Sequence, residues 1–259
     1  MYQAEISRDH PALILFLFDC SYSMSEIYGS TNMSRGSFLA SLCNKTIDQV
    51  ILACEKGSEI RAYFEIGILS YGDGAQILKP VQSVIDYVHN PLKMEKGDID
   101  GVPIEKPVWL TDPTQKVNTD MKAGFILAQD VLTRWAQAHP ASFPSVLLHV
   151  SDGEWTTDNP LATAHEISNK VKTDDGACII MNIHIGSNVS EVIIFPSQEP
   201  SGTKHQKALF QMSGILPDSF LQRARETYGH VDSDARGYMF NAQPDDLSKF
   251  FDIGTRLIG

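Results

Sequence analysis

Residues 13–23 read Leu-Ile-Leu-Phe-Leu-Phe-Asp-Cys-Ser-Tyr-Ser, an apolar run that ends in a carboxylate and two hydroxyls. A short run of Leu, Ile and Phe predicts a strand that is buried on both faces of a sheet. Asp19, Ser21 and Ser23 occupy every second position, so a chain that is just beginning to turn directs their side chains the same way. Three small oxygen donors at a strand's end suit a hard cation such as Mg²⁺.

Apolar strands alternate with amphipathic helices along the rest of the chain. The periodicity predicts strands over residues 13–19, 62–71, 75–81, 145–152, 177–186 and 237–241. It predicts helices over residues 34–56, 119–138, 161–172, 204–212, 217–228 and 244–257. This order is typical of a doubly wound α/β fold, Rossmann-like, with a mostly parallel sheet and helices on both faces. Gly72-Asp73-Gly74 predicts a hairpin turn that leads into one antiparallel edge strand.

We predict a single domain over residues 1–259, with a core of about 10–258. Two loop insertions are expected at about 90–118 and 188–203. The first contains four prolines and is interpreted as an irregular loop. Whether residues 108–110 within it form a short strand is left undecided.

The composition narrows the class of protein. The chain has 42% hydrophobic and 20% charged residues, which is ordinary for a soluble globular protein. Its net charge of −11 argues against a nucleic-acid-binding surface, which needs clustered Lys and Arg. Residues 1–10 hold no apolar signal core, and no apolar stretch reaches the length that spans a membrane. We therefore expect a cytoplasmic protein with no membrane role.

The four cysteines point to the same compartment. They are Cys20, Cys43, Cys54 and Cys178, and none belongs to a Cys-x-x-Cys pair. A zinc site is therefore not expected, and buried, reduced thiols are.

Two later loops carry further oxygen donors. Thr119 heads Thr-Asp-Met-Lys-Ala-Gly at the start of a predicted helix. Asp152 closes a predicted strand within Ser-Asp-Gly-Glu, where Gly153 lets the backbone turn sharply beside a ligand. Ligands in open α/β sheets sit beyond the carboxyl ends of the strands, so we expect both residues near Asp19.

Together these segments resemble the von Willebrand factor type A (VWA) family and its metal-ion-dependent adhesion site (MIDAS). That family has Asp-x-Ser-x-Ser after the first strand, a Thr from a middle loop and an Asp after the fourth strand. Asp19, Ser21 and Ser23 match the first part without gaps, and the family-typical Met24 follows. The order and spacing of the elements match over about residues 10–258.

The resemblance implies a non-enzymatic, metal-dependent protein-binding module. Its metal ligands would be Asp19, Ser21, Ser23, Thr119 and Asp152. The metal would be Mg²⁺, or Mn²⁺ or Ca²⁺ in its place, and an Asp or Glu of a protein partner would complete its coordination. Residues 195–217 look similar to stand-alone bacterial cytoplasmic members, which often accompany stress-response, kinase or phosphatase partners.

Other interpretations stay open. The same cation could activate water in a metal-assisted hydrolase, for which Glu154 is the nearest candidate base. The metal could instead only stabilise the loops of a structural subunit, and Asp19→Ala would separate these functions. Thr111 or Thr114 could replace Thr119 as a ligand, since both lie in the same loop. A Ser-His-Asp hydrolase through His149 is disfavoured, because no Gly-x-Ser-x-Gly elbow occurs.

Overall fold

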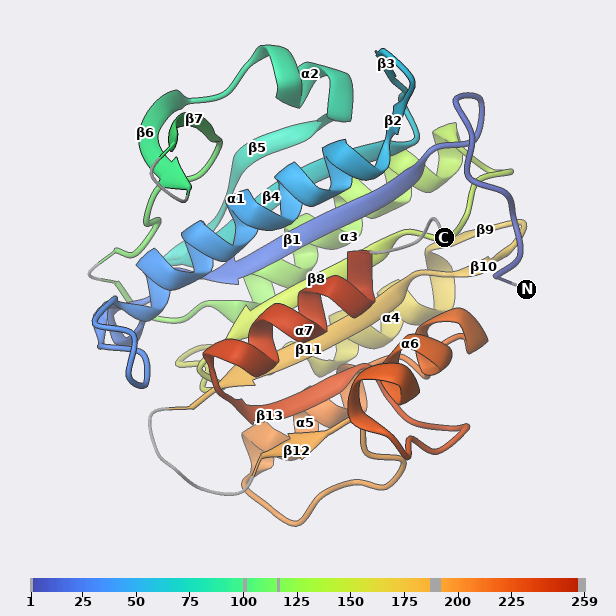
Figure 1. Cartoon of the computed structure of the whole chain (residues 1–259). Helices are drawn as coiled ribbons and strands as arrows, with labels where there is room; N and C mark the ends of the chain where they lie inside the picture. Colours follow the sequence, from blue (N-terminus) through green and yellow to red (C-terminus); the bar gives the residue numbers. More distant parts are fainter. Residues whose placement is uncertain (1, 100–101, 116, 187–191, 256–259) are drawn as a thin grey trace.

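A seven-stranded sheet forms the centre of the molecule (Figure 1). The computed structural model of the chain describes residues 2–99, 102–115, 117–186 and 192–255. The strands of this sheet are β1 (Ala12–Asp19), β4 (Phe64–Gly72), β5 (Gly74–Ser83), β8 (Val146–Ser151), β11 (Ile179–Ile185), β12 (Ile193–Ile194) and β13 (Tyr238–Ala242). Their order is β12-β13-β11-β8-β1-β4-β5.

The sheet is mostly parallel. Strand β1 lies parallel to both β4 and β8, and β11 lies parallel to β8 and β13. The predicted antiparallel edge strand is β5, which pairs with β4 across the expected turn. The two-residue β12 adds a short antiparallel pairing at the opposite edge.

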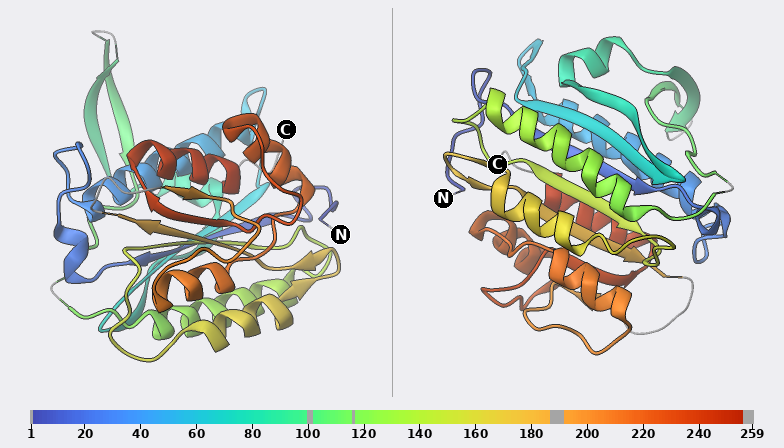
Figure 2. Two further views of the ribbon diagram at one scale, coloured as in Figure 1. Left: turned by 90° about the horizontal axis from the view of Figure 1, so that it is seen from below. Right: turned by 180° about the vertical axis from the view of Figure 1, so that it is seen from behind.

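Helices cover both faces of the sheet, as Figures 1 and 2 show from three sides. One face carries α1 (Arg35–Ala53), α6 (Asp218–Tyr228) and α7 (Pro244–Thr255). The other carries α3 (Met121–Ala138), α4 (Leu161–Lys170) and α5 (Lys204–Met212). The pleat of β1 divides its side chains between these layers: Ile14 and Phe16 join the first core, and Leu13 and Leu15 the second. This double burial explains why β1 is apolar at every position before Asp19.

The interpretation of residues 90–118 as an irregular loop is wrong for residues 93–99 and 102–108, whereas the described residues 109–115 and 117–118 are irregular as predicted. Strands β6 (Lys93–Ile99) and β7 (Val102–Val108) form an antiparallel hairpin, which projects from the body of the molecule in Figure 2. The helix α2 (Val84–His89) precedes it and was not expected either. Because the hairpin pairs only with itself, its prolines cost no hydrogen bond to a further strand. In the sequence alone, Asp100-Gly101 is a hairpin-turn signal that the count of prolines obscured; both residues lie outside the described part of the chain.

Other boundaries shift by a few residues. The first helix stops at Ala53, three residues before its predicted end, because Glu55–Lys56 and Glu59–Ile60 form the small hairpin β2–β3. Gly57 lies in the turn of that hairpin, with a φ of 67°, and does not cap the helix directly. A second small hairpin joins β9 (Lys172–Thr173) and β10 (Gly176–Ala177).

The described part of the predicted loop 188–203 packs against the domain. Ile193 and Ile194 pair with β13, and Phe195 is 3% exposed. The ring of Phe195 stacks on that of Phe250 with centroids 5.4 Å apart. This apolar segment therefore belongs to the core and is not a free binding surface.

Candidate metal centre

The predicted donors lie at the carboxyl edge of the sheet, beyond adjacent strands. Asp19 is the last residue of β1, and Asp152 directly follows β8, which pairs with β1. Thr119 precedes α3, where the chain crosses to the second face of the sheet. Ser21 and Ser23 lie at and inside the short 3-10 helix η1 (Tyr22–Ser25), which turns the chain away from β1. The parallel topology thus gathers segments that are up to 133 residues apart, from position 19 to position 152.

Asp19 fixes the first turn of the loop. Its carboxylate accepts a hydrogen bond from the backbone N–H of Ser21 at 2.9 Å and one from the hydroxyl of Ser151 at 3.1 Å. The Ser151 hydroxyl also accepts the backbone N–H of Gly153 at 2.8 Å, so it connects the ends of β1 and β8. The hydroxyl oxygens of Ser21 and Ser23 are 3.1 Å apart. The alternating pattern therefore does place its three side chains together.

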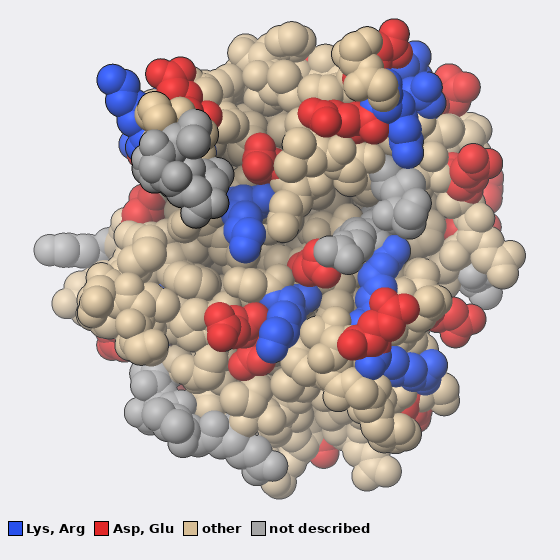
Figure 3. Space-filling view, viewed as in Figure 1, with Lys and Arg blue, Asp and Glu red and all other residues tan. Residues whose placement is uncertain are grey.

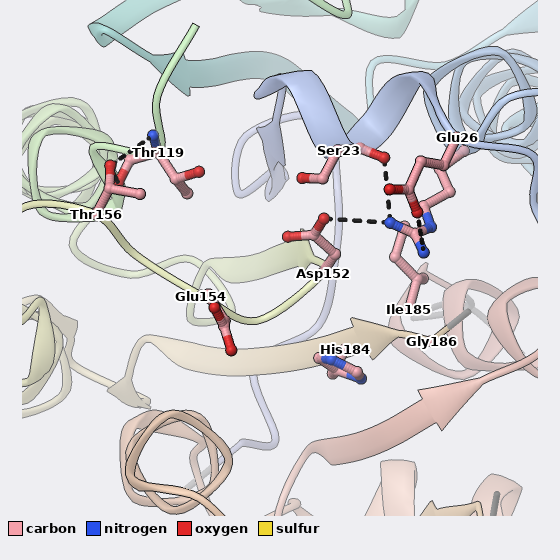
Figure 4. Close-up of a pocket in the computed structure, with 10 residues that line it drawn as sticks. Ser23, Glu26, Thr119, Asp152, Glu154, Thr156, His184, Ile185 and Gly186 are labelled. Atoms are coloured by element: carbon pink, nitrogen blue, oxygen red, sulfur yellow. Dashed lines mark hydrogen bonds and ion pairs between the residues drawn. The ribbon is translucent and has the colours of Figure 1, made fainter. Parts of the chain in front are cut away.

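Ser23, Thr119 and Asp152 line one open pocket of about 480 Å³. In Figure 4 their oxygen atoms are directed toward one another across this pocket, from three different loops. Asp19 and Ser21 lie deeper, with 0% and 2% exposure, beneath Ser23. The arrangement leaves an accessible face opposite the buried carboxylate, where a ligand from outside could approach.

The buried carboxylates at this pocket favour the binding of a cation. Burial, and then the nearby Asp152 carboxylate, raise the pKa of Asp19 well above its ordinary value. Burial also raises the pKa of Asp152. Two partly desolvated carboxylates that repel each other gain most from a divalent ion between them, and the hydroxyls add neutral oxygen donors. The donor set therefore fits a hard cation.

The position of Thr119 separates it from the alternative threonines. Asp120, not Thr119, is the N-cap of α3, because its side chain accepts the backbone N–H of Ala123 at 3.1 Å. The backbone of Thr119 is held by Thr156, whose hydroxyl accepts its N–H and whose N–H donates to its carbonyl, both at 3.0 Å. Thr119 lines the pocket, whereas Thr114 lies against Gly36 at the start of α1.

Four pocket residues with polar side chains were not anticipated as part of the centre: Glu26, Arg35, Thr156 and His184. His184 accepts the backbone N–H of Asn241 at 3.1 Å, and its ring lies against Gly153, so it positions the loop that carries Asp152. Arg35 donates to the Asp152 carboxylate at 3.2 Å. The sequence gives no signal for these contacts: that of Arg35 depends on how the loop of residues 24–34 returns to the sheet, and those of His184 on how β11 packs against β13 and the loop after β8.

The described geometry gives no support to hydrolase chemistry. His149 is buried, with one ring nitrogen 2.8 Å from the Tyr71 hydroxyl and the other 2.7 Å from the amide oxygen of Asn182. It is thus engaged by neither a serine nor a carboxylate. The side chain of Glu154 is 79% exposed, and in Figure 4 its carboxylate points away from Asp152.

His149 gives a prediction about pH. Burial lowers the pKa of His149 to about 4, from about 6.5 in the unfolded chain. The unfolded state therefore binds more protons between these values, so stability present above pH 6.5 is lost as the pH falls toward 4. We expect His149→Gln to reduce this slope by about 1.4 kcal/mol per pH unit. Urea unfolding at several pH values measures it, with the exposed His10 replaced by Gln as the control; equal slopes in wild type and His149→Gln would contradict it.

Other surfaces are less distinctive. On the face in Figure 3, acidic and basic side chains are interspersed, and the described residues form no extended basic patch there. No helix within the described ranges is both long and apolar enough to cross a bilayer. All four cysteines are buried and unpaired, as expected, and burial raises the pKa of Cys20 and Cys178 to about 12. Nor do three His, Cys, Asp or Glu side chains gather anywhere in the described part as a metal site.

Comparisons by sequence identify no relative. No family model matches the chain, and no curated protein matches it.

Comparisons by structure do identify the fold. Proximal thread matrix protein 1 from the mussel byssus aligns with a TM-score of 0.53 and 13% identity, over 97% of this chain and 49% of its own. A structure of that protein with a zinc-occupied MIDAS motif aligns equally well, at 0.53 and 12%, over 97% and 48% of the two chains. This chain thus spans about half the length of that protein.

Two bacterial proteins share the fold. An aerotolerance-related membrane protein from Bacteroides fragilis aligns with a TM-score of 0.51 and 13% identity, over 95% of this chain and all of its own. The PilB minor pilin from Streptococcus sanguinis aligns at 0.53 and 11%, over 96% and 62% of the two chains. At these identities the likeness establishes the fold alone, and it confirms the predicted VWA-like, doubly wound α/β class.

Proposed function

We propose that this chain is a metal-ion-dependent protein-binding domain. One observation supports it above the others: Ser23, Thr119 and Asp152 line one open pocket at the carboxyl edge of the sheet, and the buried Asp19 and Ser21 lie directly beneath Ser23. The residues that would hold the ion are Asp19, Ser21, Ser23, Thr119 and Asp152. A MIDAS motif in a protein of the same fold is consistent with this assignment.

The ion would be Mg²⁺ or a similar divalent cation. Hydroxyl and carboxylate oxygens are the donors that Mg²⁺ and Mn²⁺ prefer, whereas a resident zinc site would ordinarily use His or Cys. When bound, the cation supplies a Lewis-acidic position that an external carboxylate can occupy. The protein's own groups orient it: Ser151 holds the Asp19 carboxylate, and Thr156 holds the backbone of Thr119.

The partner would be a protein that presents Asp or Glu. Around the pocket, Tyr22 and Ile27 are each 60% exposed on the loop after β1, so apolar contacts can flank a carboxylate bound to the metal. The four buried thiols are the ground for proposing a reducing, cytoplasmic setting. Kinase- or phosphatase-associated partners in bacteria are a proposal from the family resemblance alone.

A selection experiment tests this function. We expect random peptides displayed on phage, bound to the wild type in Mg²⁺ and eluted with EDTA, to share an Asp or Glu. The same peptides are expected to lose at least about tenfold in affinity for Asp19→Ala, because that variant lacks the ion that binds their carboxylate. EDTA-eluted binders that share no acidic residue, or that bind Asp19→Ala as tightly as the wild type, would contradict the proposal. Asp48→Ala, which removes an exposed carboxylate from the later half of α1, is the control of equal charge change.

A further inference from the structure

A buried guanidinium lies beside the proposed metal ligands. One terminal nitrogen of Arg35 donates to the Asp152 carboxylate at 3.2 Å and to the backbone carbonyl of Ser23 at 3.1 Å. The other is 3.1 Å from the carboxylate of Glu26. The side chain of Arg35 is only 4% exposed and lines the same pocket as Ser23 and Asp152. The positive charge of Arg35 is therefore already in contact with Asp152, one of the proposed metal ligands.

The local surroundings of Arg35 make its buried positive charge energetically unfavourable. Arg35 is the first residue of α1, so its charge lies near the positive end of the helix dipole, with no acidic residue in that helix's first turn. Its Nε atom is buried and finds no hydrogen-bond partner among the described residues. A buried charge with an unsatisfied donor is costly unless neighbouring carboxylates compensate it. Asp152 and Glu26 provide that compensation.

We propose that Arg35 is a built-in cation that sets the metal affinity of this centre and admits an acidic ligand to it. The proposal rests on the metal-binding function above. Without a metal, Arg35 neutralises Asp152; a divalent cation must then share that carboxylate with the guanidinium and bind against its repulsion. Once the ion is bound, its two charges and that of Arg35 balance Asp19, Asp152 and Glu26. A carboxylate of a partner therefore meets a neutral centre rather than a negative one.

Titration of Mn²⁺ into the protein tests this role. We expect Arg35→Gln to bind Mn²⁺ at least about tenfold more tightly than the wild type, since a positive charge a few ångströms from a divalent ion is removed. The metal-free variant is expected to melt at a lower temperature, because Asp152 loses its counter-ion near Asp19, and to gain more from Mn²⁺ than the wild type does. Arg35→Lys keeps the positive charge and is expected to bind Mn²⁺ with an affinity closer to that of the wild type than Arg35→Gln does, because the repulsion of the ion is retained.

A matched control removes the same charge elsewhere. Arg8 precedes β1 at the opposite end of the sheet, with its side chain 55% exposed and paired to Glu59. We expect Arg8→Gln to leave Mn²⁺ affinity unchanged, because exposed charges separated by more than a Debye length are screened.

The outcomes separate this inference from the proposed function. Equal or weaker Mn²⁺ binding by Arg35→Gln, in a wild type that binds Mn²⁺, would overturn the role of Arg35 alone. A variant that does not fold even in excess Mn²⁺ would also overturn it, because the guanidinium would then be a purely structural group. A variant that folds only with Mn²⁺ would support it. Absence of Mn²⁺ binding in wild type, Arg35→Gln and Asp19→Ala alike would instead refute the metal function.

Discussion

Asp19→Asn is expected to abolish divalent-metal binding and at the same time to stabilise the metal-free protein. The wild-type carboxylate is fully buried, and burial and Asp152 raise its pKa, so its charge destabilises the fold when no cation is present. A neutral amide removes that repulsion, and its NH₂ group can donate to the Ser151 hydroxyl that now donates to Asp19. We expect a gain of about 1–3 kcal/mol at pH 8 without metal.

Metal reverses the ranking of the two proteins. At a free ion concentration 1,000 times Kd, the wild type gains about 4.1 kcal/mol, which exceeds the expected metal-free advantage of the variant, and the variant gains nothing. Urea unfolding with Mg²⁺ and with EDTA measures both effects. A variant that is less stable than the wild type in EDTA would contradict this electrostatic account.

Asp112 offers a control of opposite sign. Burial alone would raise the pKa of Asp112. The hydrogen bonds that its carboxylate accepts from Ser37, Thr114 and Ser34 outweigh burial and lower that pKa. Its charge is therefore stabilising, so Asp112→Asn is expected to destabilise the protein equally with and without metal.

Gly153→Ala is expected to cost about 4 kcal/mol of stability and most of the metal affinity. Gly153 has a φ of 102°, which L-residues rarely adopt. A Cβ atom there would lie 2.4 Å from the Cδ2 atom of His184, so the loop or the ring must move. Because Asp152 is the preceding residue, that movement displaces a proposed ligand.

Gly74 is a control that would have the backbone strain expected at Gly153 without the steric clash with His184. Its φ of 86° is similar, but nothing lies within 4 Å of an added Cβ. We expect Gly74→Ala to cost only about 1–2 kcal/mol and to leave metal affinity intact. Thermal melts and Mn²⁺ titrations of both variants provide the comparison, and equal losses in the two would show that the contact with His184 is unimportant.

The fold was predictable wherever burial imposes a clear period. Strand β1 is buried on both faces, so it is apolar up to Asp19, and α1 and α3 repeat their apolar residues at helical spacing. The hairpin β6–β7 escaped prediction because it stands outside the core, where no burial pattern is imposed on its sequence. Its prolines, which would break a central strand, are tolerated in a free-standing pair.

The candidate centre was predictable in part for a related reason. Asp19, Ser21 and Ser23 are close in sequence, and the carboxyl edge of a parallel sheet brings Thr119 and Asp152 to them. Arg35 follows the loop of residues 24–34, whose path depends on tertiary contacts, such as the hydrogen bond that the Tyr28 hydroxyl donates to the Ala242 carbonyl at 2.8 Å. No local pattern encodes that return, so the guanidinium in the pocket emerges only from the folded structure.

Anomalous diffraction from a crystal soaked in MnCl₂ tests the central claim most directly. The account predicts one strong manganese peak in the pocket, in contact with Ser21 and Ser23, and no peak there in crystals of Asp19→Ala grown and soaked in the same way. An empty pocket at saturating Mn²⁺, or a peak that persists in Asp19→Ala, would contradict it.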